Sequence, residues 1–271
     1  MSGTIRAWRP AVTGVSEVFH AHFPDHTYPM HTHDTWTLLL IDEGTVQFEL
    51  DHHEHGAIRS HVTLLPPHVP HDGRSATPHG FRKRVLYLDT GLLDPDLTGR
   101  AVDQPALPDP LLRHRIHQLH HTLAQPGEHL AADSRLALVV ERLTHHLRRT
   151  APQTPVRDPG LAKDLRDLLD ANVHSGLSLD TAATLLGAHP THLVRCFSRE
   201  YGIPPHQYLT GRRVDLARRL LLSGLPPAEV ATRAGFYDQS HLTRHFKRLV
   251  GTSPGRYTRP SRPGRSPGRP A

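Results

Sequence analysis

The chain has 271 residues, enough for two domains with separate cores, and its 32 Lys and Arg against 26 Asp and Glu give a formal net charge of +6. The positive charge is concentrated: residues 1–150 carry 14 basic and 17 acidic side chains, whereas residues 151–271 carry 18 and 9. The single cysteine, Cys196, excludes an intramolecular disulfide bond. No apolar stretch is long enough for a transmembrane helix, and the N-terminus lacks the apolar segment of a signal peptide, so we expect a cytoplasmic protein.

Short strands are predicted in the N-terminal region, where aliphatic, aromatic and β-branched residues gather between turn signals. The predicted strands are Trp36–Ile41, Val46–Leu50, Val62–Leu65 and Phe81–Leu88. The polar run Asp51–Gly56 is interpreted as a turn. Several short strands at this spacing favour a sandwich or barrel over βαβ units.

The pattern changes at about Pro110. Apolar residues then recur at helical spacing in two runs, separated by Gln125, Pro126 and Gly127. We expect an antiparallel helix pair over about 108–150, whose apolar stripe, which includes Leu119 and Leu143, packs on the N-terminal domain or mediates a homodimer. Residues 151–160 contain three prolines and are interpreted as a linker, and the basic tail 259–271 as disordered.

An internal repeat follows the linker. Residues 191–208 and 240–257 are identical at eight of eighteen aligned positions, at an offset of 49. Each unit begins after a short alanine-rich helical segment, Leu179–Leu186 or Ala228–Ala234, and a turn containing glycine. One face of each repeated helix is apolar and the other polar and basic, which is the layout of a helix-turn-helix motif that places its second helix in the major groove of DNA.

These residues resemble a known family. The run Ala231-Thr-Arg-Ala-Gly-Phe-Tyr-Asp-Gln-Ser-His-Leu-Thr-Arg-His-Phe-Lys-Arg, with Gly251-Thr-Ser-Pro-Gly-Arg-Tyr257, is similar to the signature of AraC/XylS-type transcriptional regulators. The resemblance covers residues 161–258 closely and, as a cupin-like sensor domain, more weakly residues 15–90. It implies two helix-turn-helix units joined by a long helix, here about Gln207–Leu222, and a one-component regulator that binds double-stranded DNA and a small-molecule effector. The predicted fold is therefore a cupin-like β-barrel (about 10–105) with the helix pair, followed by an all-helical double helix-turn-helix domain.

The candidate DNA contacts lie on the polar faces of the two repeated helices. Arg195 and Arg244 occupy equivalent outward positions, from which an arginine can donate two hydrogen bonds to guanine. Phosphate neutralisation is the alternative role for them, and the expected role of Arg199, Lys247 and Arg248. The remaining candidates are Thr191, Val194, Ser198, Gln239, Ser240 and Thr243.

Histidines suggest a second site. His31 and His33 precede one predicted strand and His71 follows another, an arrangement that resembles the two cupin motifs. Residues i and i+2 of a strand point to the same face, so two of these histidines could act together. No glutamate follows where the cupin metal site would need one, so we expect an effector pocket lined by His31, His33, Trp36 and His71, with a divalent metal on the three histidines as the alternative.

Catalysis is the rival class of function. A barrel with three histidines could be a metal-dependent enzyme fused to a DNA-binding domain, or a metal sensor. The sequence has no Gly-rich phosphate loop and no nucleophile elbow, and Cys196 lies inside the first repeated helix, so we expect a regulator without catalytic activity or cofactor.

Overall fold

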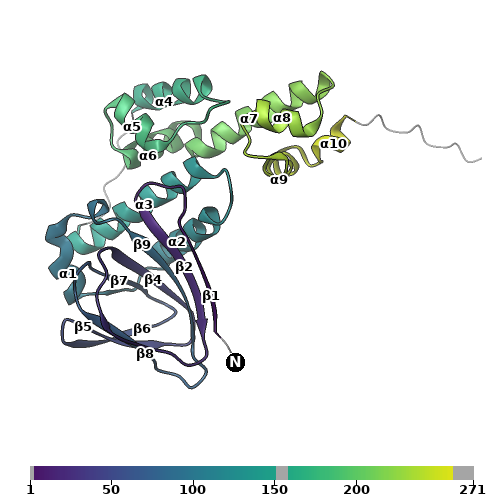
Figure 1. Cartoon of the computed structure of the whole chain (residues 1–271). Helices are drawn as coiled ribbons and strands as arrows, with labels where there is room; N and C mark the ends of the chain where they lie inside the picture. Colours follow the sequence, from purple (N-terminus) through teal and green to yellow (C-terminus); the bar gives the residue numbers. More distant parts are fainter. Residues whose placement is uncertain (1–2, 151–157, 259–271) are drawn as a thin grey trace, which may run out of the picture.

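The computed structural model describes residues 3–150 and 158–258 (Figure 1). Its N-terminal part contains two antiparallel sheets. The six-stranded sheet has the order β1 (Thr4–Trp8), β2 (Val15–Phe23), β9 (Phe81–Leu88), β4 (Trp36–Glu43), β7 (Val62–Leu65) and β10 (Ala106–Leu107). The four-stranded sheet has the order β3 (Thr27–His31), β8 (His71–Ser75), β5 (Val46–Leu50) and β6 (His53–Ala57). The predicted β-rich fold is confirmed, but its strands form two sheets and not a closed barrel. The run interpreted as a turn at Asp51–Gly56 contributes most of β6.

Strand β4 is buried on both faces, which explains its nearly continuous apolar sequence. Trp36, Leu38 and Leu40 belong to a core between the six-stranded sheet and two helices, α2 (Pro110–Leu123) and α3 (His129–Arg148). The alternate residues Leu39 and Ile41 belong to a second core between the two sheets. The large sheet is thus covered on both sides. A short connection through η1 (Thr90–Leu92), η2 (Pro95–Leu97) and α1 (Thr98–Asp103) leads from β9 towards the helices.

Helices α2 and α3 are the expected pair. Asp109 caps α2, accepting a hydrogen bond from the Leu112 amide at 3.0 Å, and its carboxylate also accepts from Arg142 and His146 of α3, each at 2.5 Å. Leu119 and Leu143, the stripe considered for a dimer interface, are fully buried in the sensor core. The structure therefore uses that stripe within the chain.

The C-terminal part is helical, and Figure 1 shows it as two groups of helices at opposite ends of α7 (Pro205–Leu222). The first group contains α4 (Pro159–Ala171), α5 (Leu179–Leu186) and α6 (Pro190–Tyr201). The second contains α8 (Pro227–Arg233), α9 (Gln239–Val250) and α10 (Pro254–Tyr257). Each has its own apolar core, and α7 contributes Leu209 to the first and Leu221 to the second. Residues 159–160, assigned to the linker from the sequence, form the first turn of α4, where proline suits the first helical position. The tail 259–271 lies outside the described residues, as does linker segment 151–157.

Helix α3 takes part in two cores. One face, with Leu136, Val139 and Leu143, packs in the sensor domain. The other contributes Leu130 to the buried core of the first helix-turn-helix unit, with Leu138 packed against it. Figure 1 shows α3 between the sheets and the C-terminal helices. The position of the DNA-binding candidates therefore depends on this helix.

Candidate nucleic-acid interface and sensor cavity

Both repeated helices end at a glycine that the repeat shares, whereas different residues cap their first turns. In the first unit, α5 ends at Gly187, whose φ of 60° is left-handed, and α6 ends at Gly202 with a φ of 73°. In the second, Asp238 caps α9 by accepting from the His241 amide at 2.6 Å, and Gly251 ends the helix with a φ of 81°. Glycine adopts this backbone conformation without steric cost, so α6 and α9 have the same length and the same exit.

The polar face of α9 is exposed to solvent over most of its length. Five of its six candidate residues are exposed and Thr243 is half-buried. The exposed ones are Gln239, Ser240, Arg244, Lys247 and Arg248.

The polar face of α6 is covered. Thr191 and Val194 are buried, Arg195 and Ser198 are half-buried, and only Arg199 is exposed. The covering element is α3: the Thr191 hydroxyl donates to the Ala137 carbonyl at 3.4 Å, and Val194 lies in the core that includes Leu130. Thr191 and Val194 thus point towards the sensor domain in this conformation, and their side chains would meet DNA only after α3 has moved.

Each of the two equivalent arginines is paired with a carboxylate of the sensor domain. Arg195 donates from Nη2 to Glu141 of α3 at 2.5 Å, with both side chains one-fifth exposed. Arg244 donates from Nη1 to Gln125 at 2.7 Å and from Nη2 to Glu128 at 2.9 Å. The acidic partners were ordinary charged residues in the sequence, and no signal there marked them as part of the interface.

Glu128 is the centre of a polar cluster at the start of α3. Besides Arg244, it accepts from His245 Nε2 at 2.7 Å, and His241 Nε2 lies 3.7 Å away. Burial acts to raise the pKa of Glu128, but the hydrogen bond from His245 and the charges of the neighbouring groups outweigh it and lower the pKa. The carboxylate is therefore ionised near neutral pH and holds α9 against the loop between α2 and α3.

The cluster of Glu128, His241 and His245 has the spacing of a metal site, but its hydrogen bonds oppose that role. The Tyr237 amide donates to Nδ1 of His241 at 3.2 Å, and Arg248 Nη2 lies 3.0 Å from Nδ1 of His245. Since both partners can only donate, both Nδ1 atoms accept and the protons lie on the Nε2 atoms that face Glu128. The cluster is thus a hydrogen-bonded contact between domains.

Gly127 permits this contact. Its φ is 82°, and a Cβ atom there would lie 2.5 Å from the His241 ring and 2.8 Å from Cβ of Tyr237. Any other residue would both strain the backbone and push α9 away from the loop. The sequence had indicated only a turn at this position.

The sensor cavity lies between the two sheets, where His31, His33 and His71 converge. His31 ends β3 and pairs in register with His71 at the start of β8, and His33 lies in the turn before β4. The ring centroids of His31 and His71 are 4.5 Å apart, and that of His33 lies 4.9 Å and 5.2 Å from them. The cavity has a volume of about 80 Å³ and is also lined by Tyr28, Lys83 and Tyr87, which the sequence analysis did not select.

Two histidines of this cavity, His33 and His71, are neutral near pH 7. Burial, followed by the neighbouring His71 and His31, lowers the pKa of His33 to about 4, and burial also lowers the pKa of His71. Burial lowers the pKa of Lys83 to about 8. His31 and His71 lie 2.7 Å and 3.0 Å, through Nδ1, from the carbonyls of Pro29 and Val69, which can only accept. In the neutral form of each ring, the lone pair therefore lies on Nε2.

Trp36 does not line this cavity. It is 1% exposed and packs on the other side of the sheet, in the core with α2 and α3. Its odd separation from His33 places it on the opposite face once β4 begins, so the expectation that Trp36 lines the pocket is wrong.

Comparisons with known proteins agree with this architecture. Residues 13–140 match the family described as the AraC-like ligand binding domain, and residues 182–260 match a helix-turn-helix domain family. The chain is 35% identical over 92 residues to the multiple antibiotic resistance protein MarA of Salmonella typhimurium, covering 34% of this chain and 72% of MarA. The chain belongs to the AraC-type transcriptional regulators.

Longer and structural matches are more distant. The uncharacterized regulator YbfI of Bacillus subtilis is 24% identical over 223 residues, which is 79% of this chain and 81% of YbfI. Among solved structures, the AraC-like transcriptional activator CuxR is 17% identical with a TM-score of 0.45, covering 79% of this chain and 80% of CuxR. The DNA-binding domain of AdpA, solved with a target DNA, is 33% identical with a TM-score of 0.33, covering 36% and 87%. The resemblance stated from the sequence is confirmed: this is an AraC-type DNA-binding regulator with a ligand-binding domain. Within residues 3–150 and 158–258, no helix is both long and apolar enough to cross a membrane.

Proposed function

We propose that the chain is a one-component regulator that reads DNA with Arg195 and Arg244, and that its sensor domain holds both arginines away from DNA in the conformation described. The observation that carries this proposal is that two arginines at equivalent repeat positions are both paired with carboxylates from the start and the middle of one sensor helix, Glu128 and Glu141. Hydrogen bonds between arginine and carboxylate are charge-assisted and geometrically specific. The sensor carboxylates thus occupy the donors that guanine O6 and N7 would use.

In the DNA-bound form, the remaining candidates divide by position. Thr191, Gln239, Ser240 and Thr243, at or near the N-terminal ends of α6 and α9, contact base edges, and Val194 offers an apolar contact to a thymine methyl group. Ser198 lies further along the polar face of α6. Arg199, Lys247 and Arg248 neutralise phosphates. Two such helices on one domain would enter successive major grooves about 34 Å apart, so one chain would protect about two turns of a site that need not be palindromic.

DNA binding by the full chain tests this proposal. The double substitution Glu128→Gln with Glu141→Gln should raise affinity for the specific site roughly tenfold, because it weakens the closed state that competes with DNA. Arg195→Ala or Arg244→Ala in that background should cost about 1–3 kcal/mol on the specific site and relax preference at one base pair. Glu229→Gln, which removes the exposed pair between Glu229 and Arg233 in α8, is the matched control and should change nothing. Unchanged affinity in the double variant would contradict the proposed closed state.

We further propose that His31, His33 and His71 bind the effector. Neutral imidazoles donate or accept hydrogen bonds according to tautomer, and the cavity of about 80 Å³ fits a very small polar ligand. Substituting His33→Ala or His71→Ala should abolish the response of transcription to the effector while DNA binding by the full chain persists. A full response in the double variant would remove this cavity from consideration.

A metal sensor is the second candidate, favoured by the free Nε2 lone pairs of His31 and His71. A ligating histidine typically donates its other ring N–H to a carbonyl or carboxylate, as these two do. The ligand atoms of the three histidines lie within 4.8 Å of one another, which suits one divalent ion. Titration of the protein with Zn²⁺ or Ni²⁺ by calorimetry, repeated with His71→Ala, tests this reading. Equal binding by both proteins would exclude it.

The proposal also covers the location, the absence of catalytic activity and the oligomeric state of the regulator. The regulator acts in the cytoplasm and is not an enzyme, in keeping with the DNA-binding family to which it belongs. It forms a homodimer through a surface other than the stripe of Leu119 and Leu143, which is internal. Sedimentation of the intact chain measures this association directly, and a monomer at all concentrations would contradict it.

A further inference from the structure

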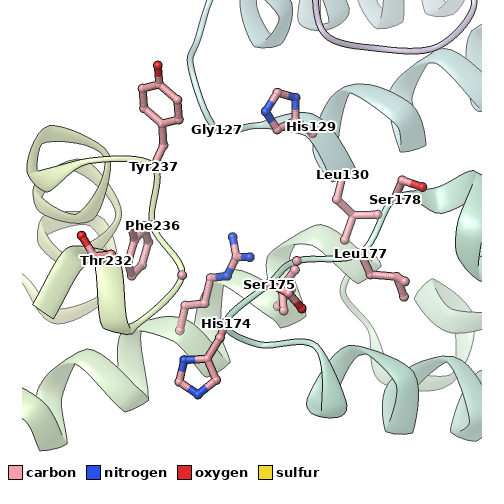
Figure 2. Close-up of a pocket in the computed structure, with 14 residues that line it drawn as sticks. Gly127, His129, Leu130, His174, Ser175, Leu177, Ser178, Thr232, Phe236 and Tyr237 are labelled. Carbon is pink, nitrogen blue, oxygen red and sulfur yellow. The ribbon is translucent and has the colours of Figure 1, made fainter.

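A cavity of about 380 Å³ lies where the sensor domain meets both helix-turn-helix units. This volume falls within the range of about 300–1,000 Å³ typical of small-molecule sites, whereas the cavity between the sheets does not reach it. Figure 2 shows its walls: Gly127, His129 and Leu130 come from the sensor side, and residues of the two units face them across the opening. Residues 174–178 come from the loop before α5, and residues 235–237 from the turn before α9.

Arg213 of α7 gives this cavity a positive charge. Its Nε donates to the Val173 carbonyl at 2.8 Å, which fixes the side chain in the wall. Among the described residues, its two terminal nitrogens have no hydrogen-bond partner. An arginine remains charged at neutral pH and presents paired donors that match a carboxylate. The charge of Glu128 acts on Arg213, but the Oε1 atom of Glu128 already accepts from Arg244 and His245.

The other side chains that line the cavity indicate the chemistry of the rest of the ligand. Leu130, Leu177, Phe236 and Tyr237 supply apolar and aromatic surface, and Ser175 and Ser178 supply hydroxyls. The backbone of Val173 packs tightly against Gly235 in this wall. A Cβ atom at Gly235 would lie 2.5 Å from the Val173 carbonyl oxygen. An apolar surface with one fixed guanidinium suits a compact organic acid.

We propose that this cavity binds a small organic carboxylate through Arg213, and that its occupation holds the regulator in the closed conformation. The regulatory part rests on the proposed function above. The ligand contacts the sensor at Leu130 and the second unit at Phe236 and Tyr237, so the complete site exists only while these parts are together. A ligand that binds one of two conformations stabilises that conformation by its differential affinity. The carboxylate therefore lowers DNA affinity.

Direct binding to the full chain tests the site without DNA. Cyclohexanecarboxylate is the probe, cyclohexanecarboxamide its neutral analogue and inorganic phosphate the bare anion, each titrated by calorimetry. The carboxylate should bind at least tenfold more tightly than either control. Arg213→Gln should reduce its affinity at least tenfold, whereas Arg219→Gln, an exposed position on the same helix, should not. Phosphate binding as tight as the carboxylate, or no binding of any probe, would overturn the assignment.

A second variant guards against misfolding of Arg213→Gln. Ser175 is exposed at the rim and lies outside α7, so Ser175→Trp should fill the cavity and abolish carboxylate binding while the far-ultraviolet circular dichroism stays unchanged. Undiminished binding in Ser175→Trp would place the ligand elsewhere and overturn the proposal.

DNA affinity measured with and without the probe tests the regulatory part. Saturating cyclohexanecarboxylate should weaken DNA binding by the wild-type chain several-fold and have no effect on Ser175→Trp. Carboxylate that binds but leaves DNA affinity unchanged would overturn the regulatory role alone. A chain that binds the carboxylate but no DNA would contradict the proposed function and leave the site established.

Discussion

The two helix-turn-helix units share eight of eighteen aligned residues, yet the sensor domain covers them unequally. Helix α3 lies along α6 and buries Thr191 and Val194, whereas α9 is touched at one end, by the loop that contains Gly127 and Glu128. Two repeats of similar sequence can therefore differ in how much of their polar face is exposed for contact with DNA. The first unit is held by packing and the second by a polar cluster, so the two contacts should respond differently to substitution.

The largest effect is expected from the packing contact. Leu130 of α3 is 8% exposed and lies in the core of the first unit, so Leu130→Ala should remove about 2–5 kcal/mol of stabilisation from the closed state. Fluorescence anisotropy with labelled DNA should then show an affinity increase of roughly thirtyfold or more. Leu111→Ala, at an exposed position on α2, is the control and should leave affinity unchanged. If both variants bind DNA like the wild type, α3 does not compete with DNA at α6.

A smaller effect is expected at the second unit. Gly127→Ala would place a methyl group within 2.5 Å of His241 and force α9 away from the loop. DNA affinity should rise roughly tenfold, since the polar cluster of Glu128 would be disrupted. Gly224→Ala has the same backbone penalty, with a φ of 93°, but no atom within 4 Å of the new Cβ. A rise in affinity in both variants would show that backbone strain, and not the approach to α9, is responsible.

The smallest effect should have the opposite sign and depend on pH. Asp133 of α3 accepts from the Leu179 amide of α5 at 3.2 Å. Burial, opposed by this hydrogen bond and by His129 and aided by Asp180, raises the pKa of Asp133 from 3.8 to about 6. Because closure raises this pKa, the closed state is favoured at low pH and loses stability as pH rises from about 4 through 6. DNA affinity should increase over the same interval.

Asp133→Asn isolates this group from the many histidines. Asparagine can still accept from the Leu179 amide but carries no charge to bury, so the variant should bind DNA several-fold more weakly than the wild type at pH 7.5. The difference between the two proteins should vanish near pH 4. A constant difference across this range would show that Asp133 does not titrate between the open and closed forms.

Many of the helices and strands could be predicted because short segments of the sequence indicate them. Helix α5 begins and ends where its alanine-rich segment predicted. Helix α7, which the family resemblance implied, begins two residues earlier than expected. Strand β6 was missed because most of its residues are exposed, so its sequence His53–Ala57 shows no alternation. Its pairing with β5 explains its formation, and this pairing is not visible in the local sequence.

The interface between domains could not be predicted from the same patterns. The arginines of the two repeats were found because they recur at the same offset, whereas Glu128 and Glu141 do not repeat and resemble any exposed acid. One signal was present: Leu130 and Leu138 fall outside the stripe formed by Leu136, Val139 and Leu143. Apolar residues on two sides of a helix indicate that it packs against two other elements, but they do not identify those elements.

The double use of α3 also has a genetic consequence. Residues on its sheet-facing side, such as Val139, maintain the sensor, and their substitution should inactivate the protein. Residues on its other side hold the proposed closed conformation, so their loss should appear as DNA binding that no longer depends on a signal. A selection for such variants should therefore return substitutions of Leu130 and Glu141 in α3, and of Gly127 just before it. These positions lie far in sequence from the helices α6 and α9 whose DNA binding they change.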